Sequence, residues 1–261
     1  MINSNNKKMN GRLIKAVVVL CLILAFGFSF LACENTKKAT DLSKNVTVLV
    51  DFSASTKQAR ADYAASWETI MKKVNMDDHV FAWKISAYSA MEPRALLDES
   101  FICDPPPKND FKKSQAKRAI RKNIDEAKVK FLMIINGETK FSGNTAIFDS
   151  LQVAERSFKN NKKERSVLVI LSDMVEDSRY NFERENLTDA RIETMIAELK
   201  KKQLVPELSG VKVYVVGACM KGAMANEKFN QIKKFWLRYF KETGASLSEE
   251  NYGSALIGFK E

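Results

Sequence analysis

Histidine is almost missing from this sequence, and its scarcity excludes several kinds of site. Only one of the 261 residues, His79, is a histidine. HExxH zinc sites, histidine-rich metal sites and C₂H₂ fingers are therefore excluded, and a Ser-His-Asp triad has a single candidate. His79 follows Asp77 and Asp78, so an Asp-paired catalytic histidine is conceivable. Its position at the start of a predicted strand favours the alternative, a turn residue entering the sheet.

The glycine-rich loops that bind phosphate are missing as well. The sequence contains no GxGxxG motif. Gly217 and Gly222 have the Walker spacing, but Ala223 and Met224 follow where that loop needs Lys and then Ser or Thr. No phosphate-binding loop of either type is predicted.

Cysteine is also scarce, with four residues in the chain. Cys21 lies within an apolar N-terminal segment and Cys33 ends it, which leaves Cys103 and Cys219 for the folded part. An exported pair can form a disulfide. The predicted topology places these two at opposite ends of the sheet, so we expect two separate, buried thiols.

The composition that is present indicates a folded, basic protein. A hydrophobic content of 45% with 10% aromatic residues excludes a disordered chain. The net charge of +10 suggests nucleic acid or an anionic membrane as partner. However, residues 1–32 contain Lys7, Lys8, Arg12 and Lys15 and no acid, so much of the excess lies in that segment.

The first 32 residues are predicted to be a targeting segment. After the four basic residues, an apolar run extends from Ala16 to Ala32, close to the lower limit for crossing a bilayer of ~30 Å. Phe30-Leu31-Ala32-Cys33 resembles a bacterial lipobox, with Phe30 where Leu is usual. The resemblance implies a signal peptide over 1–32 and a lipidated Cys33. The alternative is an uncleaved membrane anchor.

Residues 33–45 are expected to form the lipidated cysteine and a polar tether. Fully extended, the tether reaches ~40 Å, which keeps the domain close to its membrane. The residue after Cys33 is Glu34 and not an aspartate. Under enterobacterial sorting rules this favours the periplasmic face of the outer membrane, with the inner membrane as the alternative.

Residues 46–261 are predicted to form one α/β domain. Short apolar runs at 46–50, 166–171 and 211–216 are typical of buried parallel strands, and amphipathic helices alternate with them. Further strands are expected at 79–88 and, antiparallel at the edge, within 94–102. The predicted fold class is a three-layer, doubly wound, mostly parallel sheet. Helices are expected at 56–74, at 110–135, from about 145, around 192–199 and from 229 to Gly244.

Oxygen-bearing side chains follow the predicted strands at the edge where open α/β sheets bind ligands. Asp51, Ser53 and Ser55 follow the first strand, Thr145 precedes a helix, and Asp173 follows Ser172 after a later strand. These are hard oxygen donors, which select Mg²⁺, Mn²⁺ or Ca²⁺ over zinc or copper. The sequence predicts a divalent-cation site.

The DxSxS motif, the Gly-Asn-Thr segment and Val-Leu-Val-Ile-Leu-Ser-Asp occur in an order that resembles a von Willebrand factor type A (VWA) domain with a metal-ion-dependent adhesion site. The resemblance covers about residues 46–243. It implies that Ser53, Ser55 and Thr145 bind the metal directly and that Asp51 and Asp173 act mainly through water. Asp173 is followed by Met174, where many members of the family have glycine.

Two functions agree with this resemblance. In the first, the domain binds a protein partner whose acidic residue completes the metal shell. In the second, it is a structural or assembly subunit of an envelope complex with a vestigial site. We expect no enzymatic activity. A strand that ends in aspartate also resembles the phosphatases with a DxDx[TV] motif, but Ser53 stands at the position of their second acid, so the general acid/base is missing.

Two charged segments remain open. Glu176 and Asp177 either join the metal shell, repel an acidic ligand or cap their loop. The basic residues of 112–122 suit anionic lipid or nucleic acid, or simply a solvated helix face, which we favour. Export removes chromosomal DNA as a partner, and no nucleic acid is expected.

Overall fold

A computed structural model of the chain describes residues 42–91, 94–137, 143–218, 223–256 and 259. The predicted signal segment, Cys33 and most of the tether lie outside these residues, as does Cys219. In the described ranges, none of the helices combines the length and the apolar character that crossing a membrane requires.

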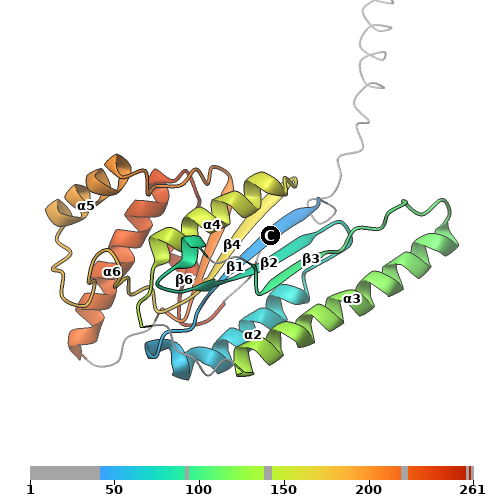
Figure 1. The fold of residues 1–261 in the computed structure, drawn as a ribbon, viewed down its shortest axis with the longest axis horizontal. Coiled ribbons are helices and arrows are strands. Elements are labelled where there is room, and N and C mark those ends of the chain that lie inside the picture. Colours follow the sequence, from blue (N-terminus) through green and yellow to red (C-terminus); the bar gives the residue numbers. More distant parts are fainter. Residues whose placement is uncertain (1–41, 92–93, 138–142, 219–222, 257–258, 260–261) are drawn as a thin grey trace, which may run out of the picture. The chain divides into compact units, whose positions relative to one another are not determined.

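A six-stranded sheet forms the centre of the domain, in the order β3-β2-β1-β4-β5-β6. β1, β2, β4, β5 and β6 are parallel, and β3 pairs antiparallel with β2 at the edge, which confirms the predicted fold class. Figure 1 shows the strands side by side between two layers of helices. The strands are β1 (Lys44–Asp51), β2 (His79–Ile85), β3 (Leu97–Ser100), β4 (Arg165–Leu171), β5 (Val211–Val216) and β6 (Tyr252–Gly253).

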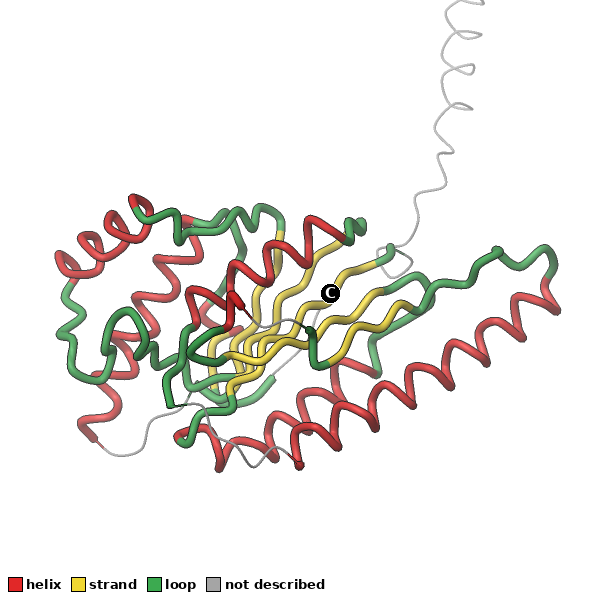
Figure 2. Tube along the Cα trace, viewed as in Figure 1, coloured by secondary structure: helices red, strands yellow, loops and turns green. Residues whose placement is uncertain are grey.

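Two helical layers cover the two faces of the sheet (Figure 2). α2 (Arg60–Met71) and α3 (Asp110–Gly137) pack on one face. α4 (Ile147–Asn160), α5 (Asp189–Lys201) and α6 (Ala223–Glu242) pack on the other. Three short 3₁₀ helices complete the elements: η2 (Ser55–Ala59), η3 (Ser89–Met91) and η4 (Glu249–Asn251).

The alternation of side chains along each strand explains why both faces are apolar. In β1, Val46, Val48 and Val50 belong to the core under α2 and α3, whereas Leu49 belongs to the core under α4, α5 and α6. A continuous apolar run is what a strand needs when helices cover both sides. The sequence pattern and the layered architecture therefore agree.

The strand order reverses between β1 and β4. The chain leaves β1 toward α2 on one face, and it leaves β4 toward α5 on the other face. At such a switch point the two outgoing loops diverge and leave a crevice at the carboxyl edge of the sheet. Asp51 and Ser172-Asp173 lie at this point because Val50 pairs with Leu171.

The element boundaries differ from the predictions in a few places. β1 begins at Lys44, two residues before the predicted strand. β2 ends at Ile85, not at Tyr88, because Ser86 and Ser89 exchange hydrogen bonds that turn the chain into η3. Gly244 has a φ of +75° just after α6, which confirms it as the predicted terminator of that helix.

Candidate functional site

The carboxylate of Asp51 shapes the loop that follows β1. Asp51 is fully buried. Its Oδ1 accepts a hydrogen bond from the Ser53 N–H at 2.7 Å, and its Oδ2 accepts one from the Ser172 hydroxyl at 2.8 Å. The Thr56 hydroxyl donates to the carbonyl oxygens of Asp51 and Ser53 at 2.9 and 3.0 Å. Internal bonds thus fix this loop and join it to the end of β4.

The two serines of the motif lie together at this edge. Their Oγ atoms are 2.9 Å apart. Ser53 is buried and Ser55 is exposed, so the pair extends from the interior to solvent. The hydroxyl of Ser55 lies beside Asp173 and lowers the pKa of that carboxyl, against the larger effect of burial. The loop after β1 and the loop after β4 therefore meet, as predicted.

The site concentrates negative charge in a poorly solvated place. Burial, followed by repulsion from Asp173, raises the pKa of Asp51 to about 6. Burial also raises the pKa of Asp173, and the charges of Glu183 and Asp177 add to the shift. The hydrogen-bond donors to Asp51, from Ser53 and Ser172, are neutral. A cation at this edge would favour the ionised carboxylates.

Thr145 joins the same edge through the loop after β4. It is 4% exposed and lies two residues before α4. Its backbone N–H donates to the carboxylate of Asp177, and its carbonyl oxygen accepts from the Asp177 N–H at 3.3 Å. This reciprocal pair holds the segment of Thr145 against the loop after β4. All five predicted residues therefore lie at the carboxyl edge of the sheet.

The sequence left the role of Glu176 open, and the structure places this residue beside the candidate site. It is fully buried. Its Oε2 accepts from the Ile147 N–H at 2.6 Å, at the start of α4, and its Oε1 accepts from the N–H groups of Ser178 and Arg179 and the Ser178 hydroxyl. Burial raises its pKa to about 6. Of the alternatives considered, the structure shows capping, and Asp177 has the same role toward Thr145.

Met174 adopts a backbone conformation that glycine favours. Its φ is +66°, in the left-handed region that non-glycine residues seldom occupy. The side chain is fully buried, and the carbonyl oxygen accepts a hydrogen bond from Trp236 Nε1 at 2.9 Å. Met174 therefore combines a left-handed turn with a buried side chain.

Two other sequence candidates lie away from this edge. His79 begins β2 at the opposite end of the sheet, and its Nε2 is 2.6 Å from Asp98, a residue of β3, which agrees with the turn interpretation. Cys103 is a free thiol, but it is partly exposed, so the expectation of a buried thiol was wrong. It lies in the loop after β3 and packs against the edge of the core under α2 and α3.

The donor set fits a hard cation only if hydroxyl oxygens take part. Among the described residues, no group of three or more His, Cys, Asp or Glu side chains could hold a metal ion. Two carboxylates and the neighbouring hydroxyls of Ser53 and Ser55 are what the edge supplies. Oxygen donors of this kind suit Mg²⁺, Ca²⁺ or Mn²⁺.

Comparison with known proteins gives a likeness of fold. No protein-family model matches the chain, and no curated protein does. A mutant of the PilB minor pilin from Streptococcus sanguinis superposes with a TM-score of 0.51 at 13% identity, over 85% of this chain and 59% of the pilin. A von Willebrand factor type A protein from Catenulispora acidiphila gives a TM-score of 0.36 at 12% identity, over 78% and 43%. The chain thus spans about three-fifths of the pilin and shares its fold. The architecture itself, a mostly parallel sheet between two helical layers, is VWA-like.

Proposed function

We propose that this chain is a membrane-attached protein of the bacterial cell envelope whose VWA-like domain binds a divalent cation and, through it, an acidic residue of a partner protein. The observation that carries the proposal is the convergence at the switch point. Asp51, Ser53 and Ser55 meet Asp173 there, and Thr145 is tied to the same loop. We propose Mg²⁺ as the cation, with Mn²⁺ or Ca²⁺ as substitutes.

Each residue has a separate task in this proposal. Ser53, Ser55 and Thr145 would hold the cation through neutral hydroxyls. Asp51 and Asp173 would act mainly through water and would balance its charge. Neutral donors leave more of the positive charge available than carboxylate donors do, and a bound cation would supply that charge to a partner's carboxylate. None of these five residues has the role of a general acid or base, so we propose binding and not turnover.

Exposed apolar side chains flank the proposed binding site. Tyr88 and Met91, in or next to η3, are 71% and 79% exposed. η3 follows β2, whose last residue Ile85 pairs with Asp51, so both side chains belong to the same edge of the sheet. Aromatic residues and methionine are enriched in protein interfaces. We propose that the partner contacts these side chains around its acidic residue.

The membrane attachment in this proposal depends on residues outside the described ranges. The lipobox-like segment ending at Cys33 supports a lipid anchor, and the polar residues 34–45 support a tether. We propose the periplasmic face of the outer membrane, with the inner membrane as the alternative.

Calorimetric titration of the purified protein with Mg²⁺ and Mn²⁺ tests the cation site. We expect one site per chain, with affinity at least about tenfold lower in Ser53→Ala and Asp51→Asn because each removes a donor or its orienting charge. Asp98→Asn is the matched control: it removes a carboxylate at the opposite end of the sheet and should bind like the wild type. A wild-type protein that binds neither Mg²⁺ nor Mn²⁺ at millimolar concentration would overturn the proposal.

Capture of partners from membranes tests the second step. A metal-dependent partner should be retained by the wild type, and both chelator and Asp51→Ala should release it. Retention that neither treatment changes would contradict the proposal and support the alternative, an assembly subunit with a vestigial metal site.

A further inference from the structure

α3 is longer than the sheet that it covers. It contains 28 residues, or ~42 Å of helix, whereas the eight residues of β1 extend ~26 Å. Its first buried residue is Ile120. The ten residues before it, 110–119, are exposed except for the half-buried Ala116. About 15 Å of helix therefore projects past the body of the domain, as Figure 1 shows at the right.

This projection lies at the end of the domain where the polypeptide enters the sheet. β3 ends at Ser100, which pairs with His79, and His79 pairs with Asn45 near the start of β1. The chain continues from there into the loop that precedes α3. The cation site is at the other end, after Asp51. The projection and the N-terminal connection thus share one end of the domain, and the proposed partner site is at the opposite end.

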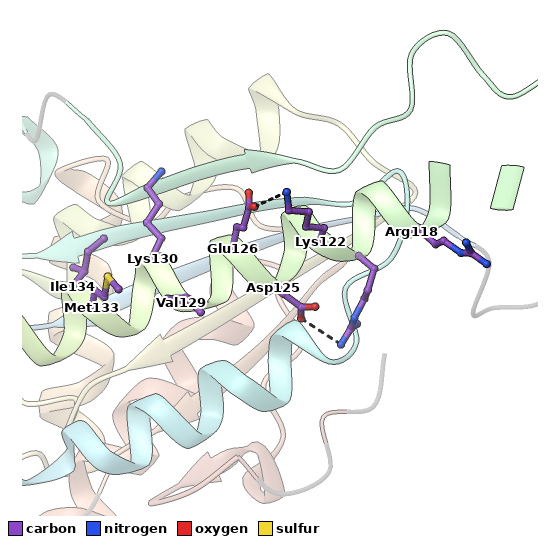
Figure 3. A pocket seen from close by; sticks show the side chains of 9 residues that line it. Arg118, Lys122, Asp125, Glu126, Val129, Lys130, Met133 and Ile134 are labelled. Atoms are coloured by element: carbon purple, nitrogen blue, oxygen red, sulfur yellow. Dashed lines mark ion pairs between the residues drawn. The ribbon is translucent and has the colours of Figure 1, made fainter. Parts of the chain in front are cut away.

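The projection and the turn after it carry unbalanced positive charge. Between Phe111 and Ile124 there are six basic residues and no acid. Among the described residues, four of the six form no ion pair. The other two pair with acids farther along the helix: Arg121 with Asp125 at 3.7 Å and Lys122 with Glu126 at 3.5 Å. Figure 3 shows these pairs, with Arg118 beyond them. The four basic residues without an ion pair to a described residue are Lys112, Lys113, Lys117 and Arg118.

Two large apolar side chains accompany these charges. Phe111, in the first turn of α3, is 72% exposed, and Ile102, in the loop before it, is 52% exposed. Helices that lie on membranes combine basic residues with exposed apolar ones, and clusters of roughly four to eight Lys or Arg residues are typical of segments that bind anionic lipid.

We infer that residues 110–122 of α3 form a docking surface for an anionic lipid bilayer. Charge complementarity favours this occupant, and so does the position of the projection beside the N-terminal connection. Docking would hold the domain with its sheet edge and candidate cation site directed away from the membrane. This inference requires neither the cation nor the partner, but it rests on the membrane attachment that is part of the proposed function.

Lysine acetylation of the full chain, reconstituted into vesicles through its own N-terminal segment, tests the inference. The vesicles contain either phosphatidylcholine alone or roughly 30% phosphatidylglycerol. On the anionic vesicles we expect the acetylation of Lys112, Lys113, Lys117 and the neighbouring Lys108, which is exposed in the loop before α3, to fall about fivefold or more. About 0.5 M NaCl should restore it. Lys201, exposed on α5 in the opposite helical layer, is the internal control and should not change.

A matched pair of variants separates this surface from general charge. Replacing Lys112, Lys113 and Lys117 by Gln should abolish the protection of the neighbouring Lys108. Replacing Arg94, Arg184 and Lys241 by Gln removes the same charge elsewhere and should leave Lys108 protected. Equal acetylation on both kinds of vesicle would overturn the inference. Protection by duplex DNA and not by anionic vesicles would also overturn it, in favour of nucleic acid.

Discussion

Two buried carboxylates, Asp51 and Glu176, make the stability of the domain depend on pH. Burial raises the pKa of each to about 6, from ordinary values of 3.8 and 4.5. A raised pKa means that the fold favours the protonated acid. Their contribution to stability is therefore fully present below about pH 4 and is lost as the pH rises to about 6.

Glu176→Gln isolates one of these two contributions. Between about pH 4.5 and 7, the wild type should lose about 2 kcal/mol more of its free energy of unfolding than the variant, because a shift of one pKa unit corresponds to about 1.4 kcal/mol. Urea unfolding across this range measures the difference. The variant's lower stability at every pH, from its weaker capping, does not affect the slope. Parallel curves for the two proteins would contradict the assigned shift.

Met174 combines an unfavourable backbone conformation with a well-buried side chain. Met174→Gly should relieve about 1 kcal/mol of backbone cost but lose about 3 kcal/mol of burial, for a net loss of about 2 kcal/mol. Met174→Leu keeps both the burial and the conformation and should stay within about 1.5 kcal/mol of the wild type. Chemical unfolding measures both variants. A Met174→Gly protein more stable than the wild type would show that the strain outweighs the packing.

At the scale of elements, the end of β5 depends on a glycine. Gly217 has a φ of +91°, and a Cβ there would lie 2.7 Å from the buried ring of Tyr63 on α2. Gly210, which precedes β5, has a φ of +77° but open space around it. A side chain would have an unfavourable backbone conformation at both positions, but only at Gly217 would it also clash with a neighbouring side chain.

Gly217→Ala should therefore destabilise the domain more than Gly210→Ala does. We expect about 1 kcal/mol for Gly210→Ala from its backbone conformation and at least about 2 kcal/mol more for Gly217→Ala. Thermal unfolding compares the two. Equal losses would mean that the Tyr63 ring moves aside without cost.

The main elements could be predicted from the sequence because the local pattern determines them. Continuous apolar runs gave β1, β4 and β5, and the apolar stripes gave the helices. β6 was missed because two residues, Tyr252 and Gly253, are too short for any pattern, and it forms only by pairing with Val215 and Val216. The end of β2 was misplaced because side-chain hydrogen bonds of Ser86 and Ser89, and not hydropathy, turn the chain there.

The sequence predicted which residues form the candidate site, but not the hydrogen bonds that hold them in place. Strand order alone brings Asp51 and Asp173 to one edge. By contrast, the hydrogen bond from Ser172 to Asp51 and the capping of α4 by Glu176 join residues 121 and 29 positions apart. Only the folded chain brings such partners together. The acidic character of the loop was the one signal for Glu176.

At the scale of the whole molecule, the two ends of the sheet have different proposed tasks. The carboxyl edge would bind the cation and partner, and the opposite edge, with the projecting part of α3, would face the membrane. The chain enters β1 at that second edge. In the proposal, an anchor at Cys33 would connect to the domain at this same edge.

Cys33→Ala tests the anchor. We expect the variant to incorporate no radiolabelled fatty acid and to retain its signal segment, because the lipidated cysteine is the site of processing in the lipobox interpretation. Cys21→Ala is the matched control in the same apolar segment and should be labelled like the wild type. Labelling of the Cys33→Ala protein would contradict the assignment, and an unlabelled wild type would support the uncleaved anchor.

The most direct test of the cation site is an anomalous difference map from crystals grown with Mn²⁺. The proposal expects one strong peak at the carboxyl edge of the sheet, at about 2–2.5 Å from the hydroxyl oxygens of Ser53, Ser55 and Thr145. The same peak should be lost from crystals of Ser53→Ala. A map without a peak at this edge, from crystals containing millimolar Mn²⁺, would contradict the proposed function.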